Sequence, residues 1–410
     1  MGKKVVILGG GFGGVTAAKA FKGTDFEVTL IDKTNHNLFL PVLYQVAAAA
    51  MSPGDIAIPI RHLLKKVKNC KVVLGEVTNI DVEKKQVHTD EYTFDYDYLI
   101  VSIGSRASYF GHDEWAEYAP GLKTLSDALT IREKMLNSFE KAEMTDDPKE
   151  QAKLLTFVVV GGGPAGVETA GALAEISKRM LKDDFRNIDP KVARVILVEA
   201  LDKILPAFSP DMSKRAIRDL EKIGVEVRLN TMVTSIDEKG VHTKDEVIET
   251  RNIVWGAGVQ GHEVIKTMNT ETDRGGRVLV ENDWSIKGHP EVFVIGDAAA
   301  FMRDGKPLPA VAPAATQPAR YTANIIKKNI AKGDREPFSY FDKGNLATIA
   351  RCKAVLEVHG IKASGFIAWV IWIVVHLAVL VEGRSRYKVL AEWIWYYAAK
   401  DNGVRIISNR

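Results

Sequence analysis

Two stretches of this chain repeat one pattern of hydrophobic and polar positions. Each has an apolar run rich in β-branched residues, then glycines, then a segment of small residues, then a second apolar run that ends in an acid. The first copy runs from KKVVILGGGFGG to FEVTLIDK, and the second from LLTFVVVGGGPAG to ARVILVEA. The pattern predicts two strand–turn–helix–strand units and therefore an α/β fold with two Rossmann-like dinucleotide-binding domains.

Other apolar runs continue this organisation. DYLIVSIGS at 97–105 and TRNIVWGAGV at 250–259 are predicted buried strands at similar distances into each half. The charged stretch 127–151 predicts a linker helix with a polar hinge at TDDPKE. EVFVIGDAA at 291–299 follows the completed second unit, so we expect the chain to return there to its first domain.

The predicted domains follow from this return of the chain. The first domain is discontinuous, over residues 1–150 and 276–345, and the second domain, 151–275, is inserted within it. A third, C-terminal region covers residues 346–410 and changes in character near Phe366.

That C-terminal region carries the apolar run FIAWVIWIVVHLAVLV, followed by a segment that mixes Trp393 and Trp395 with Lys388 and Lys400. A helix of sixteen residues spans about 24 Å, which is short of the roughly 30 Å hydrocarbon core of a bilayer. We predict a helical hairpin that lies on a membrane surface without spanning it. Burial of the same region in a dimer interface or in the protein core is the alternative.

Composition and charge exclude several classes of protein. The chain has 410 residues, of which 46% are hydrophobic and 26% charged, as in globular proteins of two or three domains. A net charge of +3 and the lack of a helix-turn-helix pattern argue against nucleic acid as a partner. The two cysteines, Cys70 and Cys352, form no Cys-x-x-Cys pair, so we expect neither a disulfide framework nor a metal site. The first strand follows Met1 so closely that a signal peptide is not expected.

The first glycine turn has the spacing that a dinucleotide requires. Gly9, Gly11 and Gly14 stand where a side chain would block the tight bend, the pyrophosphate or the contact between strand and helix. Asp32 ends the next strand and is placed to accept hydrogen bonds from a ribose diol. Asp297 ends the late strand, where a carboxylate suits the ribityl chain of a flavin. We therefore predict FAD at the first turn.

The second turn repeats the spacing with Gly161, Gly163 and Gly166, and Glu199 ends its second strand. A carboxylate about 4 Å from a 2′-phosphate would cost about 4 kcal/mol at an effective dielectric near 20. The second turn is therefore predicted to bind NADH in preference to NADPH. The alternative is that Glu199 points to solvent.

The order of these elements resembles the pyridine nucleotide and FAD-dependent oxidoreductases related to glutathione reductase, over roughly residues 1–345. The resemblance implies that nicotinamide stacks on the flavin and that a hydride passes to its N5 atom. Disulfide reductases of that superfamily carry a redox cysteine pair beside the first dinucleotide helix. This chain has NLFLPVLYQVA there, so the electron acceptor is expected to be something other than a protein disulfide.

The run NHNLFLPVLYQVA, the stretch APAATQ at 312–317 and the apolar tail resemble type II NADH:quinone oxidoreductases over essentially the whole chain. The quinone motif of that family is commonly Ala-Gln-x-Ala-x-Gln, with proline as a frequent variant at the first glutamine. The resemblance implies that Pro313 and Gln317 border a quinone, although Pro318 stands where a second glutamine often follows. It also implies that Glu168 touches the nicotinamide ribose or amide. The alternative is that Glu168 lies in the first turn of its helix and interacts with the helix macrodipole. His376 either lines the quinone route or is a satisfied core residue.

The activity that the resemblance implies is transfer of two electrons from NADH, through tightly but non-covalently bound FAD, to a membrane quinone. Ubiquinone and menaquinone remain open, and no proton pumping is expected. The flavin carries the chemistry, so no catalytic side chain is predicted. A homodimer on the cytoplasmic face of the membrane is expected. The alternatives are a sulfide:quinone oxidoreductase, for which Cys70 and Cys352 are the candidates, and a redox-sensing membrane adaptor.

Overall fold

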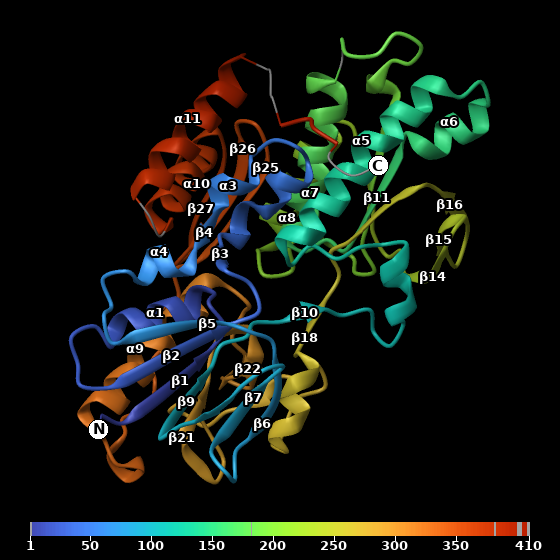
Figure 1. Cartoon of the computed structure of the whole chain (residues 1–410). Coiled ribbons are helices and arrows are strands. Elements are labelled where there is room, and N and C mark those ends of the chain that lie inside the picture. The colour runs from blue at the N-terminus through green and yellow to red at the C-terminus, as the bar shows by residue number, and fades with distance from the viewer. Residues whose placement is uncertain (1, 182, 381–382, 400–403, 408–410) are drawn as a thin grey trace. The chain divides into compact units, whose positions relative to one another are not determined.

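The computed structural model describes residues 2–181, 183–380, 383–399 and 404–407. It divides into two compact units, each built from three chain segments (Figure 1). Unit 1 comprises Met1–Leu38, Ala57–Arg106 and Val259–Lys343. Unit 2 comprises Phe39–Ile56, Ala107–Gly258 and Gly344–Arg410.

Unit 1 is built on a six-stranded sheet in the order β20-β21-β9-β1-β2-β5. Its strands are parallel except β20, which runs antiparallel to β21. Because β21 pairs with β9, the chain returns to this sheet after residue 258. The strands are β1 (Lys4–Leu8), β2 (Glu27–Asp32), β5 (Cys70–Leu74), β9 (Tyr98–Val101), β20 (Ser285–Ile286) and β21 (His289–Val294).

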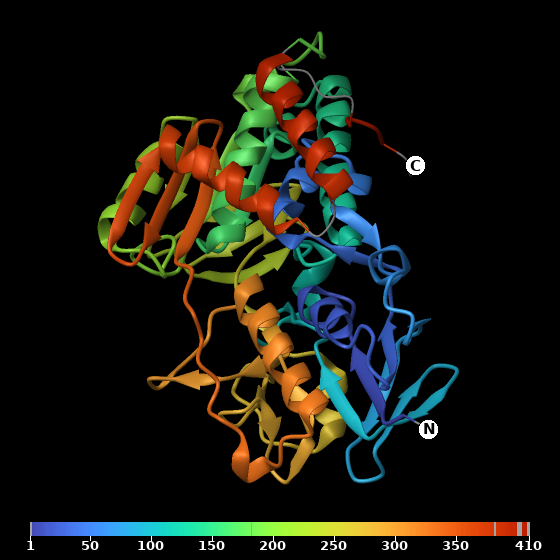
Figure 2. The same cartoon turned by 90° about the vertical axis from the view of Figure 1, so that its left-hand side faces the viewer.

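Helices α1 (Phe12–Ala20) and α9 (Ala312–Lys328) of unit 1 pack against each other (Figure 2). Val5 and Ile7 of β1 are fully buried, because both faces of a central parallel strand are covered. The smaller elements are α4 (Ile60–Leu64), β3 (His36–Leu38), β4 (Ala57–Pro59), β6 (Val77–Asp81), β7 (Gln86–Thr89), β8 (Thr93–Asp95), β19 (Val278–Leu279), β22 (Ala299–Ala300), β23 (Met302–Arg303) and β24 (Lys306–Pro307). The short strands β10 (Arg106–Ala107) and β18 (Val259–Gln260) lie where the chain passes from one unit to the other.

Unit 2 contains a four-stranded parallel sheet in the order β13-β12-β11-β17. The predicted linker helix is two helices separated by residues 145–147 (TDD), and a capping box of Thr124 and Asp127 starts the first of them. The helices are α5 (Leu125–Met144), α6 (Pro148–Leu154), α7 (Pro164–Glu175) and α8 (Pro210–Glu221). The strands are β11 (Thr156–Val160), β12 (Arg194–Val198), β13 (Val225–Arg228), β17 (Asn252–Trp255) and the antiparallel group β14 (Val233–Asp237), β15 (Gly240–Thr243) and β16 (Val247–Glu249).

The C-terminal part of unit 2 is an antiparallel sheet followed by two helices. The strands are β25 (Asn345–Ala350), β26 (Lys353–Val358) and β27 (Ile361–Gly365), and the helices are α10 (Phe366–Val379) and α11 (Gly383–Ala399). Helix α10 packs on this sheet (Figure 2), and α11 contacts the short helix α3 (Pro53–Ile56). Helix α2 (Leu43–Ala47) contacts α5 and α7. The segment 39–56 is therefore held by the same unit as the tail.

Candidate functional site: two dinucleotide turns and their acids

The first glycine turn joins β1 to α1 in unit 1. Gly9 has a φ of 93°, and a Cβ there would lie 2.4 Å from the carbonyl oxygen of Ser102. A Cβ on Gly14 would lie 1.8 Å from the carbonyl oxygen of Gly9. At Gly11, by contrast, no protein atom lies within 4 Å of the Cβ position. The fold itself therefore requires the first and third glycines, whereas the second faces open space at the start of the helix.

The second turn, between β11 and α7 in unit 2, has the same division of roles. Gly161 has a φ of 108°, and its Cβ would lie 2.7 Å from the backbone nitrogen of Ala257. A Cβ on Gly166 would lie 1.8 Å from the carbonyl oxygen of Gly161, and again no atom lies within 4 Å at Gly163. The repeat seen in the sequence therefore appears in the structure as the same role for each of the three glycines.

Both helices leave their N-terminal N–H groups available. The cap residues, Gly11 of α1 and Gly163 of α7, provide no side-chain cap, and neither first turn contains an acid. Free N–H groups and the positive end of the helix dipole favour a phosphate at such a position. These N–H groups and the open space at the second glycine fit the pyrophosphate of one dinucleotide in each unit.

The two acids are tied to their turns in the same way. One oxygen of Asp32, Oδ2, accepts a hydrogen bond from the Gly10 nitrogen at 2.5 Å, and Oδ1 accepts one from the Thr34 nitrogen at 2.6 Å. Glu199 Oε2 accepts from the Gly162 nitrogen at 2.5 Å, and Oε1 accepts from the Leu201 nitrogen at 2.8 Å. These bonds hold each carboxylate beside its turn and leave lone pairs for a ribose diol.

Asp297 lies in a 3₁₀ turn directly after β21, where its Oδ2 accepts a hydrogen bond from Ser105 Oγ at 3.2 Å. Gly296 before it has a φ of 68°, and its Cβ would lie 3.1 Å from the Cβ of Ala315. A larger residue at 296 would therefore push the first turn of α9 away. Unit 1 thus brings Asp297 and the start of α9 together.

The side chain of Gln317 forms two hydrogen bonds to the backbone of its own unit. Its Nε2 donates to the Phe341 carbonyl at 2.8 Å, and its Oε1 accepts from the Phe341 nitrogen at 3.0 Å. One amide hydrogen and one lone pair remain beyond these two bonds. Pro313 stands in the first turn of α9, where a helix needs no N–H donor, and Pro318 lies buried inside the helix.

Glu168 is the fifth residue of α7 and lies one position beyond its first turn, where the macrodipole acts less strongly on a carboxylate. Its Oε1 accepts a hydrogen bond from the Thr348 nitrogen at 3.3 Å. Burial raises the pKa of Glu168 to about 8, because removal from water disfavours the charged carboxylate. Glu168 is therefore mostly protonated at pH 7 and can donate a hydrogen bond.

His376 on α10 is held in one tautomer. Its Nδ1 donates to the Trp372 carbonyl at 2.7 Å, because a carbonyl can only accept. The ring stacks on that of Trp372 with centroids 4.2 Å apart, and Phe39 meets it edge-on at 6.3 Å. Burial lowers the pKa of His376 to about 4, so the ring is neutral at pH 7 and its Nε2 is an acceptor.

A buried polar chain beneath the tail was not predicted. Trp393 Nε1 donates to Gln45 Oε1 at 2.8 Å, and Gln45 Nε2 donates to the Tyr44 hydroxyl at 2.9 Å. Both Trp393 and Gln45 are buried, and the ring of Trp372 lies 5.1 Å from that of Trp393. The sequence pointed to both segments but held no signal that joined residues 348 positions apart.

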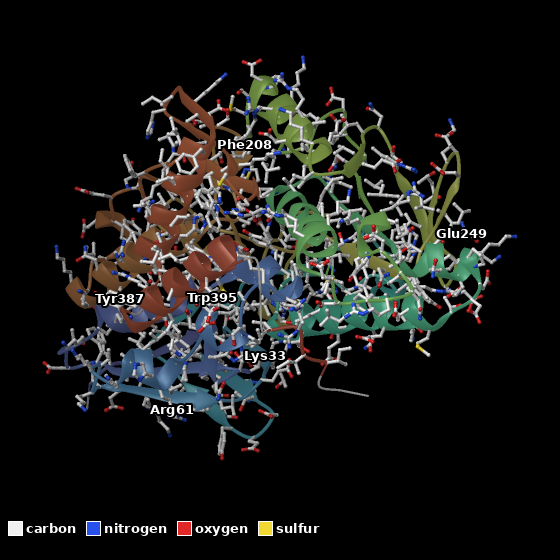
Figure 3. All side chains as sticks on the ribbon, turned by 90° about the horizontal axis from the view of Figure 1, so that it is seen from above. Lys33, Arg61, Phe208, Glu249, Tyr387 and Trp395 are labelled. Atoms are coloured by element: carbon white, nitrogen blue, oxygen red, sulfur yellow. The ribbon has the colours of Figure 1, made fainter. Side chains whose placement is uncertain are left out.

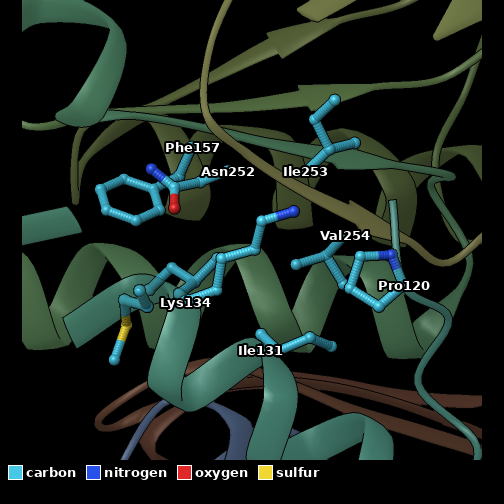
Figure 4. A pocket seen from close by; sticks show the side chains of 9 residues that line it. Pro120, Ile131, Lys134, Phe157, Asn252, Ile253 and Val254 are labelled. Atoms are coloured by element: carbon cyan, nitrogen blue, oxygen red, sulfur yellow. The ribbon is translucent and has the colours of Figure 1, made fainter. Parts of the chain in front are cut away.

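A small cavity lies between α5 and the strands β11 and β17 (Figure 4). Its volume of about 10 Å³ is room for at most a single water molecule. Its lining includes Ile131, Lys134, Phe157 and Asn252 and none of the predicted site residues. Among the residues that the structure describes, no cluster of His, Cys, Asp and Glu is arranged to hold a metal ion.

The predicted site residues divide between the units. Unit 1 holds Gly9, Gly11, Gly14, Asp32, Asp297, Pro313 and Gln317. Unit 2 holds Gly161, Gly163, Gly166, Glu168, Glu199 and His376.

Comparison with known proteins agrees with this geometry. Residues 3–319 match the family described as pyridine nucleotide-disulphide oxidoreductase. The chain is 44% identical, over 99% of its length and 90% of the relative, to a type II NADH:quinone oxidoreductase of Mycobacterium tuberculosis. It is 30% identical to a type II NADH:quinone oxidoreductase of Staphylococcus saprophyticus, over 87% of this chain and 90% of that one.

Solved structures show the same fold. NDH2 of Plasmodium falciparum in complex with NADH superposes with a TM-score of 0.91 at 21% identity and covers 100% of both chains. The sulfide:quinone oxidoreductase of Aquifex aeolicus gives a TM-score of 0.75 at 19% identity, over 97% of this chain and 96% of that one. The predicted α/β fold is confirmed, and so is the resemblance on which the sequence analysis relied. Two dinucleotide turns on this fold, with relatives that match nearly end to end, place the chain in the pyridine nucleotide-disulphide oxidoreductase family, among the type II NADH:quinone oxidoreductases.

Proposed function

We propose that this protein oxidises NADH and passes two electrons through FAD to a membrane quinone. The observation that carries the proposal is the pair of dinucleotide turns, each with an open second glycine and an acid bound to the turn. Relatives at 44% and 30% identity named type II NADH:quinone oxidoreductases supply the donor and the class of acceptor.

FAD is assigned to unit 1, whose glycine turn and Asp32 bind the adenosine diphosphate part while Asp297 faces the ribityl chain. When bound, FAD supplies a ring that accepts a hydride and releases electrons to a second substrate. The protein's own residues position it. Gly11 leaves room for the pyrophosphate, and the uncapped start of α1 provides N–H donors to it.

NADH is assigned to unit 2, with its pyrophosphate at Gly163 and its adenosine ribose at Glu199. The carboxylate of Glu199 is fixed by two backbone N–H groups, so it cannot turn away from a 2′-phosphate without breaking both bonds. NADPH is therefore the poorer substrate. Protonated Glu168 donates a hydrogen bond to the nicotinamide amide or its ribose.

Each unit is assigned its own residues toward the quinone: Pro313 and Gln317 in unit 1, and His376 in unit 2. Gln317 has one amide hydrogen left for a quinone carbonyl. Neutral His376, whose Nδ1 hydrogen is bound to Trp372, offers only its Nε2 lone pair. His376 therefore suits the hydroxyl of the reduced quinol better than the carbonyl of the quinone.

The tail is proposed to bind the cytoplasmic face of the membrane as a monotopic hairpin. Among the described residues, no helix is long and apolar enough to cross a bilayer. Helices α10 and α11 nevertheless expose a set of large apolar side chains, of which Figure 3 labels Tyr387 and Trp395. The set is Phe366, Ile367, Val370, Val374, Val375, Val379, Tyr387, Leu390, Ile394 and Trp395. On α11 their spacing, mostly three and four residues, places them along one side of the helix, whereas on α10 they include two adjacent pairs and extend around more than half of the helix.

The cations near this surface differ in their roles. Arg386 and Lys388 are exposed on α11. Arg405 forms an ion pair with Asp184. Lys400 lies outside the described residues.

A homodimer is also proposed, and it offers the other way to cover the apolar side of the tail. Sedimentation without detergent distinguishes a tail that binds the membrane from a tail that forms the dimer interface. If Ile394→Asp is still a dimer, the dimer is held by another surface. A dimer that dissociates in that variant is held by the tail.

The sulfide:quinone alternative finds little support in the cysteines. Cys70 is half-buried, and burial raises the pKa of its thiol to about 11, so it is not a thiolate at pH 7. Cys352 belongs to the other unit.

The proposed function is tested by steady-state oxidation of NADH with a water-soluble quinone. We expect NADH consumption that depends on the quinone, and much slower consumption of NADPH. Equal rates with NADH and NADPH would contradict the role of Glu199. Loss of NADH that is independent of the quinone would overturn the quinone reductase proposal.

A further inference from the structure

The balanced charge of the chain conceals one strongly basic stretch. Residues 56–75 contain five Lys or Arg and no Asp or Glu. Because five of the 55 Lys and Arg lie here, the remaining 50 are outnumbered by the 52 Asp and Glu. The basic residues are Arg61, Lys65, Lys66, Lys68 and Lys71.

The structure turns this stretch into a charged surface of unit 1. Ile60, Leu64 and Val67 are buried in the core of the unit, and this anchors α4 and the turn after it. The five cations between and after them are all exposed, as Figure 3 shows for Arg61. Among the described residues, none of the five forms an ion pair, whereas Lys84 and Lys85 of the same unit do.

Lys71 has a structural reason to be there. It lies on β5, the edge strand of the six-stranded sheet, where an exposed lysine discourages pairing with another sheet. Arg61, Lys65, Lys66 and Lys68 lie outside any strand, so that reason does not apply to them. Unneutralised cations on one surface are the electrostatic footprint of an anionic partner.

We propose that the part of this basic stretch outside the strand, residues 61–68, is a second membrane contact that binds anionic lipid headgroups. The inference rests on the proposed function, which places the electron acceptor in a membrane. Chain continuity favours lipid over nucleic acid: the stretch follows α3 after only four residues, and α3 packs against α11, the helix with the exposed Leu390, Ile394 and Trp395. Cations joined through a short length of chain to an apolar membrane-binding element suit attachment to an anionic leaflet.

The two contacts predict different lipid dependence. Apolar side chains of α11 bind neutral and anionic bilayers alike, whereas the basic stretch contributes only on anionic ones. Each cation near an anionic surface contributes roughly a fivefold change in binding, so removal of two should weaken binding about 30-fold. The effect should shrink as salt is raised.

The experiment compares two lysine pairs in the full-length protein. Lys65→Gln/Lys66→Gln removes two exposed cations of the basic stretch, and Lys327→Gln/Lys328→Gln removes an adjacent exposed pair elsewhere in unit 1. Binding to neutral phosphatidylcholine vesicles, and to vesicles that also contain phosphatidylglycerol, is measured by sedimentation at low and high salt. NADH oxidation with a soluble quinone is measured on every variant.

We expect about 30-fold weaker binding of Lys65→Gln/Lys66→Gln to anionic vesicles only, with little change in the control pair. Equal losses in both pairs, or no loss in either, would overturn the proposal. A third contradicting result would be that the wild type binds duplex DNA more tightly than anionic vesicles and that Lys65→Gln/Lys66→Gln abolishes the binding to DNA. The partner would then be nucleic acid. Failure of quinone-dependent turnover in the wild type would instead count against the proposed function, since the soluble assay needs no membrane.

Discussion

In each dinucleotide turn, replacing the second glycine should weaken ligand binding, whereas replacing the third glycine should lower stability. Gly163→Ala places a methyl group where no protein atom lies within 4 Å, and the residue's φ of −70° and ψ of 175° suit alanine. The worse N-cap and the smaller entropy of the unfolded chain roughly cancel, so the stability change should stay within about 1 kcal/mol. Gly166→Ala instead brings a methyl group to 1.8 Å from the Gly161 carbonyl oxygen.

The loss of affinity for NADH in Gly163→Ala follows from the space that the methyl group takes. If it displaces one charge-assisted hydrogen bond between the pyrophosphate and the start of α7, binding weakens by about 1.5 to 3 kcal/mol. This corresponds to a rise of about 10- to 150-fold in the KM for NADH. Gly166→Ala should cost about 1 to 3 kcal/mol or more in stability, because α7 must move away from the turn.

The assay pairs steady-state kinetics, with NADH and a soluble quinone, with thermal unfolding of both variants. An unchanged KM in Gly163→Ala would refute the position of the pyrophosphate. A drop in Tm as large as that of Gly166→Ala would refute the claim that the second glycine faces open space. The corresponding change in unit 1, Gly11→Ala, should lower FAD content on purification in the same way.

Three further predictions concern buried titratable side chains. Asp283 contacts the buried Arg335 at 2.8 Å, so Asp283→Ala should cost about 3 to 5 kcal/mol in urea unfolding, whereas the exposed Asp304→Ala should cost little. The pKa of Glu168, raised to about 8, should appear as a pH dependence of NADH kinetics near pH 8 that is absent in Glu168→Gln. Because the folded pKa of His376 is lowered to about 4 from 6.5, the unfolded state binds a proton first as pH falls. Folding stability should therefore drop by about 2 kcal/mol between pH 7 and pH 5, and His376→Gln should lose this part of the pH dependence in denaturant titrations.

The features that could be predicted from the sequence are local in the chain. Gly9 and Gly14 lie within one turn, and Asp32 follows at the end of the next strand, so their spacing carries the geometry. The bonds of Gln317 to Phe341 and of Glu168 to Thr348 join residues 24 and 180 positions apart. No periodicity reports such pairs, because tertiary packing sets them.

Burial also changed the chemistry that residue type alone suggested. The sequence offered Glu168 as an ordinary carboxylate, but removal from water makes it an acid that is mostly protonated at pH 7. The basic stretch was hidden for another reason, since a net charge of +3 averages over 410 residues. Only the outward placement of its lysines made it a surface.

In the proposed reaction, electrons pass from NADH to FAD and then to a quinone. Rapid mixing without oxygen tests both halves: the purified protein is first mixed with NADH and then with a soluble quinone, while the flavin absorbance is followed. We expect bleaching with NADH and recovery with the quinone, each at least as fast as steady-state turnover. A flavin that NADH bleaches but the quinone does not restore would contradict the proposed reaction.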